Sequence, residues 1–160
     1  MSRLVRLTLV LAASLSAACG EQAAESPTRV AGHLFTDARS GVGLDLPSVW
    51  TGRYQIGDSV TTTTAGLERE LAFRFVRADS TVVREPLIVL RVFKTAAWNQ
   101  IPTDAAGGLF GTVIASNDSH TVAVRPAAGN PLVPGTADAL AYDSLMMIVL
   151  QRPLRASLRP

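Results

Sequence analysis

Short segments in which apolar and polar residues alternate recur along the chain, and this pattern predicts strands with one buried face. One further segment, residues 87–93, is apolar on both faces apart from Arg91, which is typical of a strand in the middle of a sheet. The sequence thus predicts about six strands. They cover residues 42–46, 50–56, 68–77, 87–93, 109–116 and 121–125.

Polar turn residues between these segments indicate that neighbouring strands run antiparallel. Residues 79–80 separate the third predicted strand from the fourth, and residues 117–120 separate the last two. A helix is predicted to start after Thr136, a residue suited to an N-cap, and to end before Pro153. The apolar run 145–150 would also suit a strand, but the cap and the length favour a helix. We therefore predict an α+β fold, an antiparallel sheet of about six strands covered by a C-terminal helix.

Residues 1–18 have the composition of a secretory signal peptide. Arg3 and Arg6 form a positive start, residues 7–15 are mostly apolar and uncharged, and residues 16–18 are small. A membrane-spanning helix needs about 20 apolar residues, so this run is too short to be one. We expect residues 1–18 to direct export and to be removed.

Cys19, the single cysteine of the chain, follows the signal peptide directly. Its setting, LSAACG at residues 15–20, resembles the lipobox of bacterial lipoproteins, with Ser16 where leucine is usual. The resemblance implies that Cys19 is lipidated and holds the chain on a membrane. Gly20 implies, by the same resemblance, the periplasmic side of the outer membrane of a Gram-negative-type bacterium. Ser16 and Ala18 also suit the ordinary signal peptidase, so a secreted or periplasmic soluble protein is the alternative.

Removal of the signal peptide leaves an electrically neutral chain. The full sequence has 15 basic and 13 acidic residues, and the loss of Arg3 and Arg6 leaves 13 of each. A neutral domain has no electrostatic attraction for nucleic acid. Residues 19–33 are small, polar and aperiodic, and we expect the lipidated Cys19 and a flexible tether there. Residues 34–160 are predicted to form a single α+β domain.

Both ends of this domain carry motifs that resemble a known group of proteins. Phe35 and then GLDLPSVWTGRY at residues 43–54 give a strand, a proline, a tryptophan and a second strand with a glycine and an aromatic residue. The segments 130–132, 138–145 and 156–158 look like the helix and closing segment of the same group. These are uncharacterised small bacterial lipoproteins and secreted proteins with a PsbP-like domain. The resemblance implies an α/β sandwich that acts as an accessory or interaction module, and it transfers no catalytic residue.

No pattern in the sequence predicts a catalytic or metal site. The domain has one usable histidine, His120, in a predicted polar turn where a histidine is usually solvated. One histidine and no free thiol are too few ligands for zinc, and no cofactor motif is present. We expect no enzyme activity, no metal and no cofactor, and a hydrolase using His120 is the least favoured hypothesis. The carboxylates that such chemistry would use are Asp45, Glu68, Glu70 and Glu85.

Four residues are candidates for binding. Arg91 interrupts an apolar strand, and a buried charge is costly unless it is paired. Arg91 is therefore predicted to have a partner or to reach the edge of the sheet, and the alternative is that it anchors the carboxylate or phosphate of a ligand. Trp50, Tyr54 and Trp98 either pack in the core or rim a recognition surface. The leading hypothesis is a non-catalytic binding or assembly module with a protein partner in the cell envelope. The alternative is a domain that binds a small anionic molecule.

Overall fold

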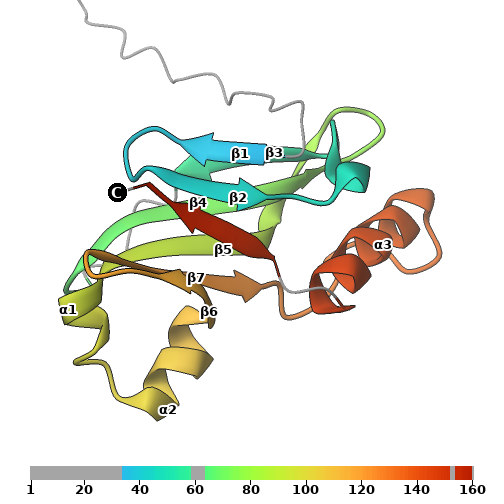
Figure 1. Ribbon diagram of the computed structural model, residues 1–160. Coiled ribbons are helices and arrows are strands. Elements are labelled where there is room, and N and C mark those ends of the chain that lie inside the picture. Colours follow the sequence, from blue (N-terminus) through green and yellow to red (C-terminus); the bar gives the residue numbers. More distant parts are fainter. Residues whose placement is uncertain (1–33, 59–63, 152–153, 160) are drawn as a thin grey trace, which may run out of the picture.

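The structure is a computed structural model that describes residues 34–58, 64–151 and 154–159. The predicted signal peptide, Cys19 and the tether lie outside these residues. The described chain forms eight strands in two antiparallel sheets, with one long helix beside them (Figure 1). The strands are β1 (Leu34–Asp37), β2 (Val42–Asp45), β3 (Tyr54–Asp58), β4 (Leu67–Val76), β5 (Val82–Lys94), β6 (Thr112–Ser116), β7 (His120–Pro126) and β8 (Arg155–Leu158).

The smaller sheet, in the order β1-β2-β8, joins the first and last described strands. β1 and β2 are connected by a tight turn in which the Asp37 carboxylate accepts hydrogen bonds from the backbone N–H (2.9 Å) and the hydroxyl (2.6 Å) of Ser40. β8 pairs with the free edge of β2, with Val42 opposite Leu158. The last strand therefore closes onto the first hairpin (Figure 1).

The larger sheet has the order β3-β4-β5-β7-β6, and every neighbouring pair is antiparallel. β4 and β5 are its longest strands, with 10 and 13 residues, and the turn between them contains Ser80 with a φ of +69°. β5 lies at the centre of the sheet, as its two apolar faces predicted. Glu70 on β4 lies opposite Arg91 on β5.

The hydrophobic core lies between the two sheets. The Phe35 ring of β1 packs edge-on to the Phe73 ring of β4, with 5.2 Å between centroids, and the Tyr54 ring lies 5.7 Å from Phe73. Because successive side chains of a strand point to opposite faces, only one face of the larger sheet contributes to this core. Its buried side chains are Leu71, Phe73, Ile88, Leu90, Val92, Val122 and Val124.

Helix α3 (Ala137–Gln151) packs against the end of the core through Tyr142 and Leu145. The hydroxyl of Thr136 accepts a hydrogen bond from the backbone N–H of Ala139 at 3.2 Å, which confirms the predicted N-cap. The buried Trp50 indole donates to the Leu145 carbonyl at 3.4 Å and ties the helix to the sheets. Within the described residues, no helix is long and apolar enough to cross a membrane.

The α+β class, the antiparallel pairing and the C-terminal helix are confirmed, but the number of strands differs from the prediction. The described residues form eight strands rather than about six. β1 and β8 account for the difference, and each has only four residues. Neither shows the clear alternation of apolar and polar residues that identified β2, and both form strands by pairing with β2.

Two segments predicted as strand begin with helical turns instead. Residues 48–50 form the 3-10 turn η1 (Ser48–Trp50), in which the Trp50 N–H donates to the Pro47 carbonyl at 2.9 Å. Gly52, with a φ of +72°, then turns the chain into β3. Residues 109–110 belong to the π-helical turn η2 (Ala106–Phe110), and β6 starts only after Gly111. The alternation of large and small residues resembles a strand in both places, but tight turns made by proline and glycine determine the local structure.

Candidate functional site

The face of the larger sheet that points away from the core, which we call the outer face, carries Glu70, Arg91 and Arg125. One end of this face is covered by the short helices α1 (Thr95–Trp98) and α2 (Thr103–Ala105) and by η2. The Phe93 ring packs against α1 and η2, since its centroid lies 5.0 Å from that of Trp98 and 5.3 Å from that of Phe110. The remainder of the outer face contains a pocket.

Arg91 is fixed on the outer face by several partners. Its Nε donates to the carboxylate of Glu70, and its Nη1 donates to the carbonyl oxygens of Leu109 at 3.0 Å and Phe110 at 3.3 Å. The Arg91 and Glu70 side chains are only 11% and 7% exposed. The first of the two predicted roles of Arg91, a partnered charge, is thus the one seen here, and it holds the end of η2 against the sheet.

A pocket of about 480 Å³ lies beside this ion pair. Val89 and Pro86 of β5 line it, and Arg125 of β7 lies opposite Val89 in the sheet. Arg125 makes one weak hydrogen bond, from Nη1 to the Leu109 carbonyl at 3.4 Å. The complete lining is Glu70, Glu85, Pro86, Val89, Arg91, Arg125, Pro126, Ala127, Ala128, Gly129, Asn130 and Pro131.

The loop that forms one wall of the pocket, residues 127–131, is held by hydrogen bonds to the rest of the domain. The Ala127 N–H donates to the Leu87 carbonyl at 2.8 Å. The Asn130 amide donates to the Ala139 carbonyl and to the Asp143 carboxylate, both at 2.9 Å. These bonds reach β5 and α3, so the wall is set before any ligand arrives.

The hydroxyl of Tyr142 in α3 donates to the Gly129 carbonyl at 3.4 Å from the other side of this loop. Burial, together with the negative charges of Glu85 and Asp143, raises the pKa of Tyr142 to about 12. The phenol therefore stays neutral at physiological pH and remains a hydrogen-bond donor to the loop.

The aromatic candidates do not form a common recognition surface. Trp50 and Tyr54 are fully buried in the core, 5.9 Å apart between ring centroids, with exposed fractions of 0% and 1%. Trp98 belongs to the separate cluster with Phe93 and Phe110 on the outer face. Core packing is therefore the arrangement found for Trp50 and Tyr54, and burial raises the pKa of the Tyr54 hydroxyl.

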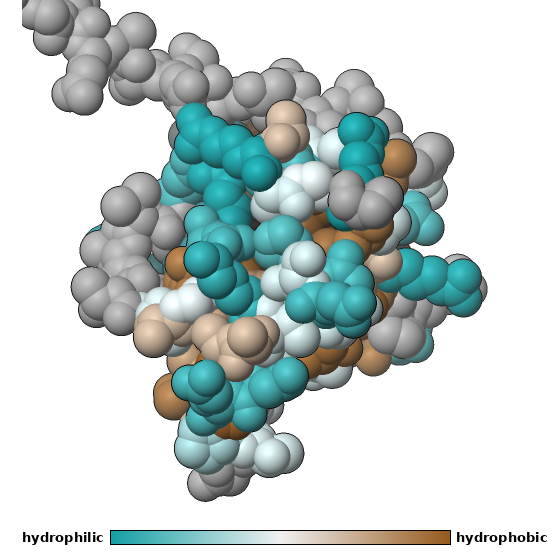
Figure 2. Space-filling view, turned by 60° about the vertical axis from the view of Figure 1, so that its left-hand side comes forward, coloured by the Kyte–Doolittle hydropathy of each residue, from teal (hydrophilic) through white to brown (hydrophobic). Residues whose placement is uncertain are grey.

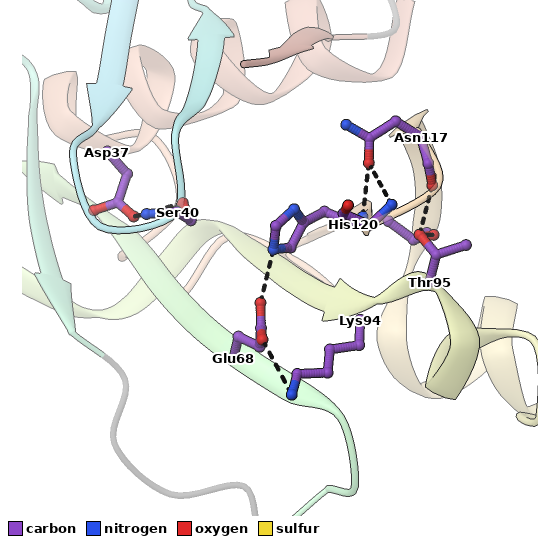
Figure 3. Close-up of polar contacts among 9 residues, drawn as sticks. Asp37, Ser40, Glu68, Lys94, Thr95, Asn117 and His120 are labelled. Atoms are coloured by element: carbon purple, nitrogen blue, oxygen red, sulfur yellow. Dashed lines mark hydrogen bonds and ion pairs between the residues drawn. The ribbon is translucent and has the colours of Figure 1, made fainter. Parts of the chain in front are cut away.

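His120 belongs to a polar network with Glu68 and Lys94, and its ring has no hydroxyl partner among the described contacts. Its Nε2 lies 2.9 Å from a carboxylate oxygen of Glu68, and the Lys94 ammonium lies 3.7 Å from the other oxygen (Figure 3). The nearby Thr95 hydroxyl donates to the Asn117 carbonyl at 2.8 Å. A histidine held by a carboxylate but not aimed at a nucleophile lacks the geometry of a catalytic triad.

The described residues also include no group of three or more His, Cys, Asp or Glu side chains close enough to hold a metal ion. The four candidate carboxylates lie in different surroundings. Glu68 pairs with His120 and Glu70 with Arg91, while Glu85 lines the outer-face pocket and Asp45 lines a different hollow beside α3. The carboxylates are thus not assembled into one acidic site.

Helix α3 exposes three large apolar side chains. Leu140, Met147 and Leu150 are 61%, 51% and 65% exposed. On the face seen in Figure 2, hydrophilic side chains are prominent and the apolar areas between them are interrupted. Exposed apolar side chains gathered on one element commonly mark an interaction surface.

The chain matches no family model, no curated protein and no solved structure. The arguments for function therefore rest on the chain's own residues. Among these, the sequence prediction missed Arg125 and the exposed side of α3. For α3, the spacing of Leu140 and Met147 could have indicated that the two side chains lie on the same side of the predicted helix. Nothing in the sequence distinguishes Arg125 from other surface arginines, because the other side of its pocket comes from β4 and β5, which are distant from it in the sequence.

Proposed function

We propose that the chain is an exported bacterial lipoprotein, anchored through Cys19, that acts as a non-catalytic binding module in the cell envelope. The signal-peptide pattern of residues 1–18 and the lipobox-like setting of Cys19 support the location, with the periplasmic side of the outer membrane as the proposed site. A PsbP-like α/β sandwich is the proposed fold family. The two facing sheets and the helix that precedes the last strand are compatible with it.

The observation that carries the binding function is an uncharged stripe along the exposed side of α3. Its members are exposed residues spaced alternately three and four positions apart, so they lie on one line along the helix. We call this set the α3 stripe, and Leu150 flanks it. The stripe consists of Ala137, Leu140, Ser144, Met147 and Gln151.

The charges of α3 are not in the stripe and are already engaged by the domain. The Asp138 carboxylate lies 3.3 Å from the Arg77 guanidinium and accepts from the Ala78 N–H at 3.2 Å. Asp143 accepts from the Asn130 amide at 2.9 Å. Even the Ser144 hydroxyl is used, since it donates to the Leu140 carbonyl at 2.8 Å. A partner therefore meets a surface with few unsatisfied polar groups.

The partner that fits this surface is an apolar face of a helix from another envelope protein. Spacing of three and four residues, with small side chains at Ala137 and Ser144, allows a second helix to approach closely. A helix of 15 residues is about 22 Å long, and a stable dimer buries about 800 Å² on each partner. A single stripe between two copies of this chain falls short of that area, which favours a partner that also contacts neighbouring surface.

A pull-down from detergent-solubilised envelope tests this function. The wild type and the variant Leu109→Ser/Val113→Ser, which removes two exposed apolar side chains elsewhere, are expected to recover the same defined protein. Leu140→Ser/Met147→Ser is expected to lose it and to keep its folding stability, because exposed positions contribute little. Equal recovery by all three, or no specific protein with any of them, would contradict the proposed interface.

The anchor is tested separately with radiolabelled palmitate. Label is expected on the wild type and not on Cys19→Ala, and the substituted chain should leave the membrane fraction. An unlabelled wild type would mean that the chain is simply secreted, whatever its partner.

A second candidate function is the binding of a small anionic molecule in the outer-face pocket. The observation that favours it is the Arg125 guanidinium at the pocket, which forms no ion pair among the described residues. A volume of about 480 Å³ lies within the range of ligand sites in proteins. Arg91, the anchor proposed from the sequence, lines the pocket together with its partner Glu70. Its Nε and Nη1 atoms already donate to Glu70 and to the Leu109 carbonyl, so the end of the guanidinium is not free to bind a ligand carboxylate.

A further inference from the structure

The outer-face pocket holds two charges of opposite sign that the domain does not neutralise. Arg91 and Glu70 form an ion pair and cancel each other. Arg125 and Glu85 line the same pocket, are both exposed, and form no ion pair within residues 34–58, 64–151 and 154–159. The pocket therefore has one available cation and one available anion.

These two charges lie toward different ends of the pocket. Arg125 is opposite Val89 in the sheet, and Glu85 is four positions before Val89 on β5. At about 3.3 Å per residue, the two backbone positions are about 13 Å apart along the strand. Both side chains are long, so the distance between the guanidinium and the carboxylate can be shorter than the distance between the backbone positions. A ligand that contacts both groups must carry its own charges at two separated points.

The surface between the two charges is apolar. Pro86 and Val89 lie between them on β5, and Ala127, Ala128 and Pro131 form the facing wall. The hydrogen bonds of Asn130 and Tyr142 hold that wall in place. A pocket of this kind favours a short apolar segment between the charged ends of its ligand.

We propose that the outer-face pocket binds a small zwitterion with its carboxylate on Arg125, its ammonium on Glu85 and a short apolar middle over Pro86 and Val89. Two sources share this chemistry, namely short peptides with free termini and ω-amino acids. The inference rests on the second candidate function, small-molecule binding, and adds the class of ligand to it. It is independent of the α3 stripe.

Titrations of the mature chain (residues 19–160, unlipidated through Cys19→Ala) with small probes test this inference, by calorimetry and by NMR shifts of pocket residues. The probes are 6-aminohexanoate, hexanoate, hexylamine, Ala-Leu-Ala with free termini, and its N-acetylated amide. We expect 6-aminohexanoate or the free peptide to bind about tenfold more tightly, or better, than the probes that lack one or both charges, because each charged contact contributes about a factor of ten. Whichever of the two is tighter identifies the source.

Matched variants assign each end of the ligand. Wild type is expected to bind 6-aminohexanoate more tightly than hexylamine or hexanoate. Arg125→Gln should abolish the difference in affinity between 6-aminohexanoate and hexylamine. Glu85→Gln should abolish the difference in affinity between 6-aminohexanoate and hexanoate. Arg84→Gln and Asp118→Asn change exposed charges outside the pocket and should leave both differences intact.

The possible failures are distinguishable. Equal affinity for hexanoate and 6-aminohexanoate, with loss of both in Arg125→Gln, would overturn the zwitterion and keep anion binding. No shift of any pocket residue with any probe would overturn both the inference and the second candidate function. Binding that survives Arg125→Gln and Glu85→Gln would place the ligand elsewhere and overturn the inference.

Discussion

Arg91 and Glu70 face each other across β5 and β4, and their nearly buried side chains form an ion pair on the outer face of the larger sheet. The same guanidinium donates to the Leu109 carbonyl at the end of η2. One arginine thus neutralises a buried carboxylate and holds a helical segment on the sheet. This arrangement explains why a charge interrupts the most apolar strand of the protein.

Arg91→Met is expected to destabilise the domain by about 3 kcal/mol, because it removes the cation that forms the ion pair with the nearly buried Glu70 carboxylate. Arg91→Met combined with Glu70→Gln should be less destabilised than the single variant, since no unpaired charge remains. Urea unfolding followed by circular dichroism measures both. A double variant that is less stable than Arg91→Met would show that the Glu70 carboxylate makes favourable contacts of its own, beyond the ion pair with Arg91.

Trp50→Ala is expected to lower the free energy of unfolding by about 3–5 kcal/mol, the usual loss when a buried large aromatic side chain is removed. Trp50 is fully buried and also donates to the Leu145 carbonyl. Trp98→Ala, at a partly exposed position, serves as the control and should lose clearly less. Equal losses in thermal or urea unfolding would contradict the placement of Trp50 at the centre of the core.

Tyr54→Phe is expected to leave the domain as stable as the wild type or to stabilise it by about 1 kcal/mol. The Tyr54 hydroxyl is buried and has no hydrogen-bond partner within the described part of the chain. Removing it eliminates the cost of desolvating a polar group without losing a contact. A loss above about 1 kcal/mol in urea unfolding would reveal a hydrogen bond to this hydroxyl.

Asp37 is expected to make the domain sensitive to acid. Burial alone would raise its pKa, but hydrogen bonds from Ser40 and the charge of Arg69 outweigh this and lower the pKa below its usual value. Because the folded state has the lower pKa, the stabilisation is present above the unfolded pKa of about 3.9 and is lost as the pH falls through the folded value.

The comparison of wild type with Asp37→Asn over a pH series tests this linkage. The wild type should be more stable at pH 6, and the difference should shrink as the pH falls below about 4. Arg39→Gln changes a charge in the same turn, on a side chain that is 66% exposed, and should keep the acid transition. A difference that is the same at every pH would mean that Asp37 acts through its shape and not through its charge.

The sequence predicted the elements whose patterns are local and long. The central strand β5 and the Thr136 cap of α3 were recognised because apolar runs and capping residues act over a few neighbouring positions. β8 was missed because its pairing with β2 joins residues more than a hundred positions apart. Trp50 was assigned to a strand because the turn after Pro47 retains the spacing of large side chains that a strand would have.

The candidate site was predicted less well than the fold. Arg91 was singled out correctly as an unusual charge, but its partner Glu70 is fixed by the register of β4 against β5, which the sequence pattern does not determine. Arg125 and Glu85 become neighbours of one pocket only because the 127–131 loop folds back toward β5. Leu140 and Met147 are exposed because the opposite side of α3 packs against the core, and the sequence pattern does not determine which side of the helix does so.

The most direct test of the proposed binding module is photo-crosslinking from the α3 stripe in cells that export the full chain. A photoreactive amino acid at Met147 or Leu140 is expected to capture one and the same envelope protein, with the linked peptide in an apolar helix of that protein. The same probe at Val113, also exposed but on β6, should not capture it. Capture of the same protein from Val113, or of no protein from Met147 and Leu140, would contradict the account.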